Sequence, residues 1–79
     1  RQMSFIKFIQ MQEEFKIEGE YIELMQLLKA IGLAQTGGNA KMIVDSEIVF
    51  RNGEIETRRR AKIRSGEQIK IKDHIIDLK

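Results

Sequence analysis

The densest group of side chains able to bind a ligand is a basic run in the C-terminal half of the chain. Arg58, Arg59 and Arg60 are consecutive, and Lys62 and Arg64 follow at alternate positions. Three consecutive arginines cannot share one face of a strand, so we expect them in a turn and at a strand start. Guanidinium groups bind phosphates through paired hydrogen bonds and stack on bases, which favours a nucleic acid as ligand. A solvated basic edge that prevents sheets from pairing is the simpler interpretation, and composition alone leaves both open.

A second candidate site is the string Thr36-Gly37-Gly38-Asn39-Ala40-Lys41. The free backbone N–H groups of a helix start bind anions, and the missing Cβ of Gly lets another backbone approach closely. The string lacks the spacing and the Gly-Lys-Ser/Thr ending of a nucleotide-binding P-loop, which excludes that function. The alternative is a turn between two helices that needs glycine for clearance.

Catalytic and metal-binding chemistry has little support in the residue types. The chain has one His and no Cys, and His74 is expected in a turn beside Asp73. The pairs Glu13-Glu14 and Glu54/Glu56 have the alternation of ordinary exposed strand residues. We therefore expect no enzyme activity, no cofactor, no metal and no small-molecule substrate.

Length and charge describe one small domain with a segregated basic segment. The chain has 79 residues, of which 33% are charged and 42% hydrophobic, and a net charge of +2. Residues 51–79 contain nine basic and five acidic residues, whereas residues 1–50 contain five basic and seven acidic ones. The small total is therefore a cancellation that hides a local positive field. The absence of Cys fits a cytoplasmic protein, and no apolar run approaches the length needed to cross a membrane.

Two short helices are predicted in the first half of the chain. Apolar residues recur with helical spacing over residues 21–31 (Tyr21, Leu24, Leu27, Leu28, Ile31), and Gly32 gives the expected stop. A second helix is expected from an N-cap at Thr36 to about Ser46. The connection is short, so the two helices should pack against each other.

Strand patterns surround these helices. We expect strands at residues 13–17, 48–51, 61–64, 69–72 and 75–78, with turns at Asn52-Gly53, Ser65-Gly66 and Asp73-His74. The predicted fold class is α+β: two packed helices followed by a small antiparallel sheet in meander order, which an N-terminal strand joins. We assign residues 1–12 to an N-terminal extension and residues 13–79 to the domain.

The order and spacing of these segments resemble the S4-type RNA-binding domain. The resemblance extends over about residues 14–72, and it lies in Leu24, Leu28, Gly32, Ala34, Thr36, Ala40, Lys41, Ile43, Val44 and Asn52-Gly53. Short stand-alone bacterial members are similar to the chain also at Gly37-Gly38-Asn39-Ala40-Lys41, Asn52-Gly53-Glu54, Glu56-Thr57-Arg58-Arg59, Lys62-Ile63 and Gly66-Glu67. The chain departs from the pattern at Glu23 and Gly37, where many members have Arg, and at Glu47, where Gly is common.

The resemblance implies a helix pair known as the αL motif, with RNA bound across the helices and the following hairpin. Carried onto this chain, it implies these RNA-binding residues: Thr36, Gly37, Gly38, Lys41, Arg51, Asn52, Arg58, Arg59, Arg60 and Lys62. We expect a non-catalytic protein that recognises the shape of structured RNA, ribosomal or transfer RNA, in the bacterial cytoplasm. The alternative is a protein-interaction adaptor that docks through the acidic stretch 13–23 and the apolar residues 1–10. The sequence does not predict an oligomeric state.

Overall fold

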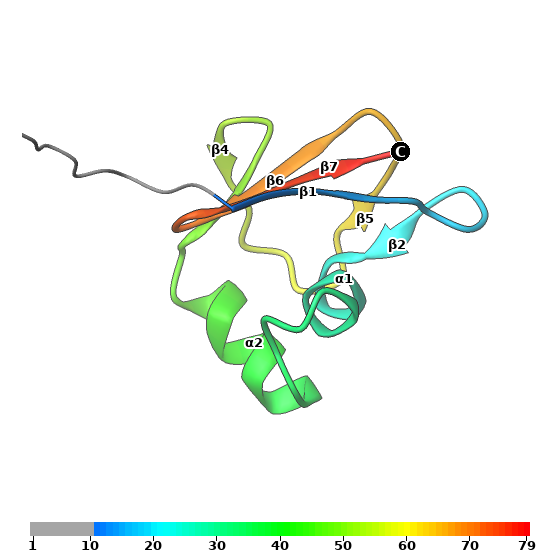
Figure 1. Ribbon diagram of the computed structural model, residues 1–79. Coiled ribbons are helices and arrows are strands. Elements are labelled where there is room, and N and C mark those ends of the chain that lie inside the picture. The colour runs from blue at the N-terminus through cyan, green and yellow to red at the C-terminus, as the bar shows by residue number, and fades with distance from the viewer. Residues whose placement is uncertain (1–10) are drawn as a thin grey trace, which may run out of the picture.

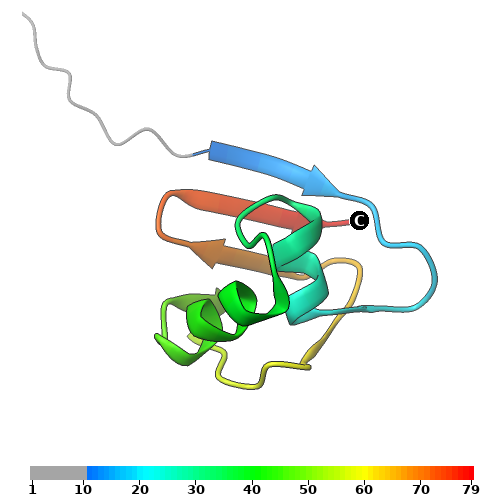
Figure 2. The ribbon, with the colours of Figure 1, turned by 90° about the horizontal axis from the view of Figure 1, so that it is seen from below.

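The computed structural model describes residues 11–79. The predicted extension therefore lies outside the described residues except for Met11 and Gln12, which open the first strand. The elements along the chain are β1 (Met11–Phe15), β2 (Ile22–Glu23), α1 (Leu24–Ala30), α2 (Gly37–Asp45), β3 (Val49–Arg51), β4 (Glu54–Ile55), β5 (Lys62–Ile63), β6 (Gln68–Ile71) and β7 (His74–Leu78). Both helices lie on one side of the main sheet (Figures 1 and 2). The predicted α+β class is confirmed.

Helix α1 is shorter than the 21–31 segment that the apolar spacing predicts. Its leucines at 24, 27 and 28 are fully buried, as expected. Ile22 and Glu23 are extended and pair antiparallel with residues 62–63 of β5. This pairing with a distant segment outweighs the helical spacing, and it leaves Tyr21 exposed instead of in the core.

Helix α2 begins where the sequence predicts. The hydroxyl of Thr36 accepts a hydrogen bond from the backbone N–H of Asn39 at 3.1 Å, which is an N-cap contact. Ala40 and Val44 are fully buried on the side that packs toward α1. The preceding turn includes Gly32 with a φ of 86°, a conformation that favours glycine.

The main sheet has the order β1-β7-β6-β3-β4 and is mixed. The N-terminal strand joins it as predicted, but β1 pairs parallel with β7, from Met11 opposite His74 to Phe15 opposite Leu78. The meander order is wrong at β5, which leaves this sheet and forms a two-stranded sheet with β2. Ala61 and Ile63 are thereby buried in the core, whereas β6 takes the place beside β3. The last turn falls at Lys72-Asp73, one residue earlier than predicted, so His74 opens β7.

The core lies between the helix pair and the inner face of the sheet. Its fully buried larger side chains are Leu24, Leu27, Leu28, Val44, Val49, Ile63, Ile69, Ile76 and Leu78. The outer face of the sheet carries the alternate residues, and the register aligns Gln12, Ile75, Lys70, Phe50 and Ile55 in one row across it. The long segment 56–61, which crosses from β4 to β5, runs beside the helices and carries the arginine cluster.

Candidate nucleic-acid interface

The arginine segment packs against the start of α1. The backbone N–H of Leu24 donates to the carbonyl of Ala61 at 2.9 Å, and that of Met25 donates to the carbonyl of Arg59 at 3.2 Å. The first N–H groups of a helix have no partner inside the helix, so the arginine segment caps α1. Residues 59–60 form a turn that leads into β5, which confirms the expected turn and strand start.

Arg59 joins this segment to α2. Its guanidinium donates two hydrogen bonds to the carboxylate of Asp45, Nε at 3.0 Å and Nη2 at 2.8 Å. The hydrogen bond from Arg59 is the main cause that lowers the pKa of Asp45, and the charge of Lys41, one helical turn earlier, lowers it further. Lys41, Asp45 and Arg59 thus form one exposed patch in which the carboxylate neutralises part of the positive charge.

The other two arginines extend further into solvent. The side chain of Arg58 is 71% exposed although it donates to Glu56 from Nε at 3.0 Å and Nη2 at 3.1 Å. The side chain of Arg60 is 84% exposed, and its Nε lies 3.7 Å from Glu23. The longer distance makes this the loosest of the three pairs. Both guanidinium groups therefore retain N–H groups that face solvent.

Glu56 is an internal anchor, which corrects the expectation of an ordinary exposed carboxylate. The residue is only 7% exposed, and its carboxylate also accepts the backbone N–H of Arg58 at 3.0 Å. The Arg58 side-chain hydrogen bond is the largest cause that holds the pKa of Glu56 at about 2. Alternation along an isolated strand could not reveal this burial, because Glu56 lies beyond β4, where the chain turns back toward the helices.

Arg51 and Asn52 are occupied by contacts inside the domain. Arg51 is 19% exposed and donates to both carboxylate oxygens of Glu67, to Glu56 at 3.2 Å and to the carbonyl of Lys62 at 2.8 Å. These four bonds use most of the five N–H groups of a guanidinium. The hydrogen bond from Arg51 is also the largest cause that lowers the pKa of Glu67.

The Asn52-Gly53 turn is a β-hairpin turn, as the sequence predicts. Asn52 has a φ of 52° and Gly53 a φ of 93°, so both residues adopt the left-handed region. The Asn52 side chain accepts the backbone N–H of Gln68 at 2.9 Å and donates to Glu67 at 3.1 Å. Its contacts therefore tie the hairpin to β6.

The glycine pair at the start of α2 is open to solvent on its outer side. A Cβ built on Gly37 would meet no atom within 4 Å, and one on Gly38 would meet only the Thr36 hydroxyl at 3.7 Å. Neither residue has a positive φ. Clearance within the domain therefore does not require glycine here, which contradicts the helix–helix clearance interpretation. The open helix start leaves room for a group from outside.

A basic hollow lies along the arginine segment and β5. It has a volume of about 480 Å³ and is lined by Arg51, Arg58, Arg60, Ala61, Lys62 and Arg64. Within residues 11–79, Lys62 and Arg64 have no carboxylate partner, and both instead lie over the ring of Tyr21, at 5.0 Å and 5.7 Å from its centroid. The hollow can accept a phosphate group, which several of these cations would contact together.

Comparison with known proteins identifies the fold. A family model described as S4 domain matches residues 15–79. The chain belongs to the S4 domain family. This confirms the resemblance that the sequence motifs indicate.

Two curated relatives of this S4 domain are each 33% identical over 58 residues, which is 73% of this chain and 83% of the relative. They are the "Putative RNA-binding protein YbcJ" of Escherichia coli (strain K12) and the uncharacterised protein YbcJ of Shigella flexneri. The solution structure of YbcJ from E. coli matches with a TM-score of 0.67 and 28% identity, over 96% of this chain and 98% of that one. That YbcJ structure is described as revealing an alfaL motif involved in RNA binding.

The predicted residues of the S4 domain fall into two groups. Arg51, Arg58, Arg60 and Lys62 line the basic hollow, and Arg59 joins this segment to the C-terminal end of α2, whereas Thr36, Gly37 and Gly38 lie at the opposite end of that helix. Lys41, Arg58, Arg60 and Lys62 are exposed, whereas Arg51 is held in an internal network. Arg64 and Tyr21 belong to the same surface and are missing from the residues that the resemblance implies. The alternation of Lys62 and Arg64 along the strand was the available signal for Arg64. Nothing in the neighbouring sequence predicted that Tyr21 lies on this surface, because its spacing fits the apolar stripe of the predicted helix.

Metal binding and membrane crossing were each considered for residues 11–79. Among residues 11–79, no group of three or more His, Cys, Asp and Glu side chains could hold a metal ion. None of the helices in this part is long and apolar enough to cross a membrane.

Proposed function

We propose that this S4 domain is a non-catalytic binding protein for structured RNA. The observation that carries the proposal is the basic surface formed by Arg58, Arg60, Lys62 and Arg64, which the Arg59–Asp45 pair joins to α2 and its exposed Lys41. The names of the YbcJ relatives support the same ligand class. Ribosomal or transfer RNA in the cytoplasm is the proposed target, since both are folded RNAs with closely spaced phosphates.

Phosphate neutralisation is the proposed source of affinity. The exposed basic side chains contact backbone phosphates, and the α2 amides receive a further phosphate at Gly37 and Gly38, where no side chain blocks the approach. The loosely paired Arg60 exchanges Glu23 for a phosphate most easily. With about four phosphates engaged, the logarithm of the affinity falls with the logarithm of salt concentration with a slope of about −3.

The test is a binding titration with a folded transfer RNA and with fragments of ribosomal RNA at low salt. Lys62→Ala and Arg60→Ala should each weaken binding several-fold and leave the melting temperature unchanged, because both side chains are exposed. Lys70→Ala is the matched control, since Lys70 is an exposed lysine on the outer face of the sheet. Equal losses in all three variants, or no binding by the unmodified protein, would overturn the proposal.

The protein-adaptor alternative predicts a different result when the protein is purified with its partners and treated with nuclease. A protein partner that co-purifies after nuclease treatment, and that is lost when the glutamates of the 13–23 stretch are replaced, would favour it over RNA binding. Loss of the co-purifying material on nuclease treatment favours the RNA-binding function.

A further inference from the structure

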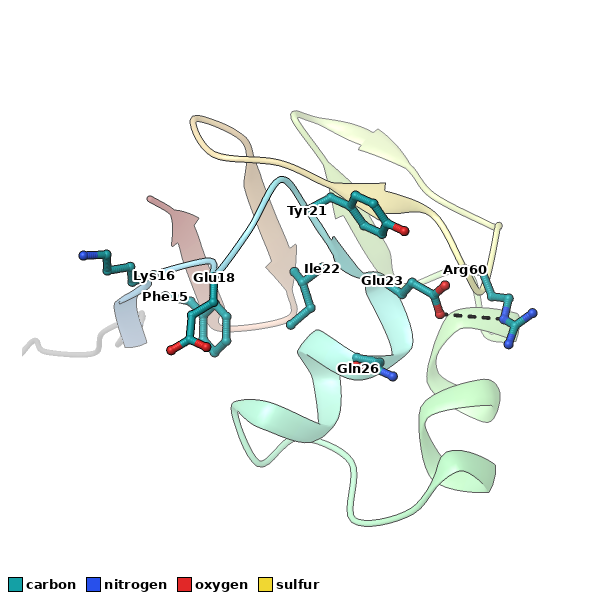
Figure 3. A pocket seen from close by; sticks show the side chains of 8 residues that line it. All are labelled: Phe15, Lys16, Glu18, Tyr21, Ile22, Glu23, Gln26 and Arg60. Atoms are coloured by element: carbon teal, nitrogen blue, oxygen red, sulfur yellow. Dashed lines mark ion pairs between the residues drawn. The ribbon is translucent and has the colours of Figure 1, made fainter.

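A second and larger hollow shares Arg60 with the basic hollow. It has a volume of about 780 Å³, and the residues that decide its chemistry are Phe15, Glu18, Tyr21, Glu23, Gln26 and Arg60. Figure 3 shows the Tyr21 ring above the opening, the Glu23–Arg60 ion pair at one end, and Phe15 with Glu18 at the other. The hollow is open to solvent and has the size of sites that bind small organic groups.

Tyr21 is exposed although the domain has few aromatic residues with which to build its core. It is the one tyrosine in a chain without tryptophan, and 38% of its surface is exposed. The position immediately before β2 holds it at the rim, because β2 is fixed by its pairing with β5. Exposed aromatic rings flanked by cations are the platforms on which unpaired bases stack.

Three cations connect the hollow under Tyr21 to the basic hollow, whereas a fourth, Lys16, lies at the other end beside Glu18. Lys62 and Arg64 lie over the ring and also line the basic hollow, and Arg60 lines both hollows. Lys62 and Arg64 are exposed long side chains, so they can move from the ring to a phosphate when a base takes their place. A nucleotide with its base on Tyr21 thus has its phosphate on the basic side.

The polar groups that line the hollow are suited to a base. Glu18 lies at one end beside Lys16, Glu23 lies at the other end beside Arg60, and Gln26 lies between them, so carboxylate and amide oxygens are present along the hollow (Figure 3). Carboxylate oxygens accept hydrogen bonds from the amino groups of bases, as they do from cytosine. These acceptor groups therefore favour a base that carries an exocyclic amino group over uracil.

We propose that this hollow holds one unpaired base of the bound RNA, stacked on Tyr21, with its phosphate at Arg60, Lys62 and Arg64. The proposal rests on the RNA-binding function proposed above and adds a preference for an unpaired nucleotide beside a helical segment. The affinity for RNA then comes from the basic surface, whereas the selection among RNAs comes from the larger hollow under Tyr21.

The experiment compares two hairpin RNAs with the same stem, one fully paired and one with a single bulged adenosine. The bulged RNA should bind roughly ten-fold more tightly, as expected for one base stacked on an aromatic ring. Its binding should also quench the fluorescence of Tyr21, whereas the paired RNA should leave that fluorescence largely unchanged. A bulged uridine should bind less tightly than a bulged adenosine.

Three variants identify the aromatic ring on which the bulged base stacks. Tyr21→Leu should remove the preference for the bulge and leave affinity for the paired hairpin unchanged, and Tyr21→Phe should retain the preference. Phe50→Leu is the control, because Phe50 is an exposed aromatic on the outer face of the sheet. Thermal unfolding of each variant separates lost binding from lost folding.

The outcomes distinguish this proposal from the general one. Equal binding of both hairpins by the unmodified protein and by Tyr21→Leu would overturn the base site and leave the RNA-binding function standing. A preference for the bulge that is lost in Phe50→Leu instead would move the site to the outer sheet face and also overturn it. Failure of both hairpins to bind would overturn both proposals.

Discussion

Replacing Asp45 with Asn releases Arg59 from the one carboxylate that holds it with two hydrogen bonds. In the unmodified protein, those bonds at 3.0 Å and 2.8 Å use two N–H groups that could otherwise contact a phosphate. The carboxylate also repels any phosphate that approaches Lys41, whose charge helps to lower the pKa of Asp45. An Asn at position 45 keeps the size of the side chain and removes the charge. We therefore expect the Asp45→Asn variant to bind RNA more tightly.

The expected size follows from counting phosphate contacts. If Arg59 gains one phosphate, the slope of log affinity against log salt becomes steeper by about 0.7 to 0.9. A fourfold rise in salt from about 50 mM to 200 mM would lower the affinity of the unmodified protein by roughly 60-fold with a slope near −3. The same rise should lower the affinity of Asp45→Asn by about three times more. The advantage of the variant is therefore greatest at low salt.

The assay is a salt series of binding titrations with one folded RNA. Glu14→Gln is the matched control, because it also removes one negative charge and frees a cation, Lys79, from an ion pair at 3.8 Å, but on β1 at the far edge of the sheet. Equal effects of the two variants would show that only net charge matters. Unchanged or weaker binding by Asp45→Asn would refute the assignment of Arg59 to the RNA surface.

Two further predictions concern Glu56, which holds Arg51 and Arg58, and Gly38 at the start of α2. The pKa of Glu56 lies at about 2, below its ordinary value of 4.5, so its contribution to stability is complete above about pH 5 and is lost as the pH falls toward 2. Glu56→Gln should therefore lower the free energy of unfolding by about 2 kcal/mol at pH 7, after allowance for screening of the exposed Arg58, and should flatten its pH dependence between pH 5 and 2 in urea titrations. An unchanged pH dependence would contradict the anchor role. Gly38→Ala should leave the melting temperature the same or higher, because its Cβ would meet only the Thr36 hydroxyl at 3.7 Å, and should weaken RNA binding in the same titration assay. Unchanged binding by Gly38→Ala would remove the α2 amides from the interface.

The sequence patterns correctly predicted the structural elements that depend only on neighbouring residues. The N-cap at Thr36 and the Asn52-Gly53 hairpin each depend on a few neighbouring residues, and the structure confirms both. The strand at Ile22 and Glu23 depends on a partner about forty residues away, so the apolar spacing of residues 21–31 extended the helix too far. The parallel pairing of β1 with β7 is equally non-local.

The contrast between local and distant interactions also applies to the candidate site. Residue type and spacing located the arginine cluster, but the carboxylates that pair with it come from separate elements. Arg59 meets Asp45 and Arg51 meets Glu67 across 14 and 16 positions in the chain. Sequence spacing therefore could not distinguish an arginine that is free for a ligand from one that holds the fold together.

The central claim, that RNA binds along α2 and at the basic hollow, is tested most directly by NMR titration of the labelled protein with a folded RNA. The account predicts that backbone amide shifts change at Gly37, Gly38 and residues 58–64, and that the outer-face residues of β6 and β7 stay unchanged. Shift changes confined to the outer face of the sheet, or none at low salt, would contradict it.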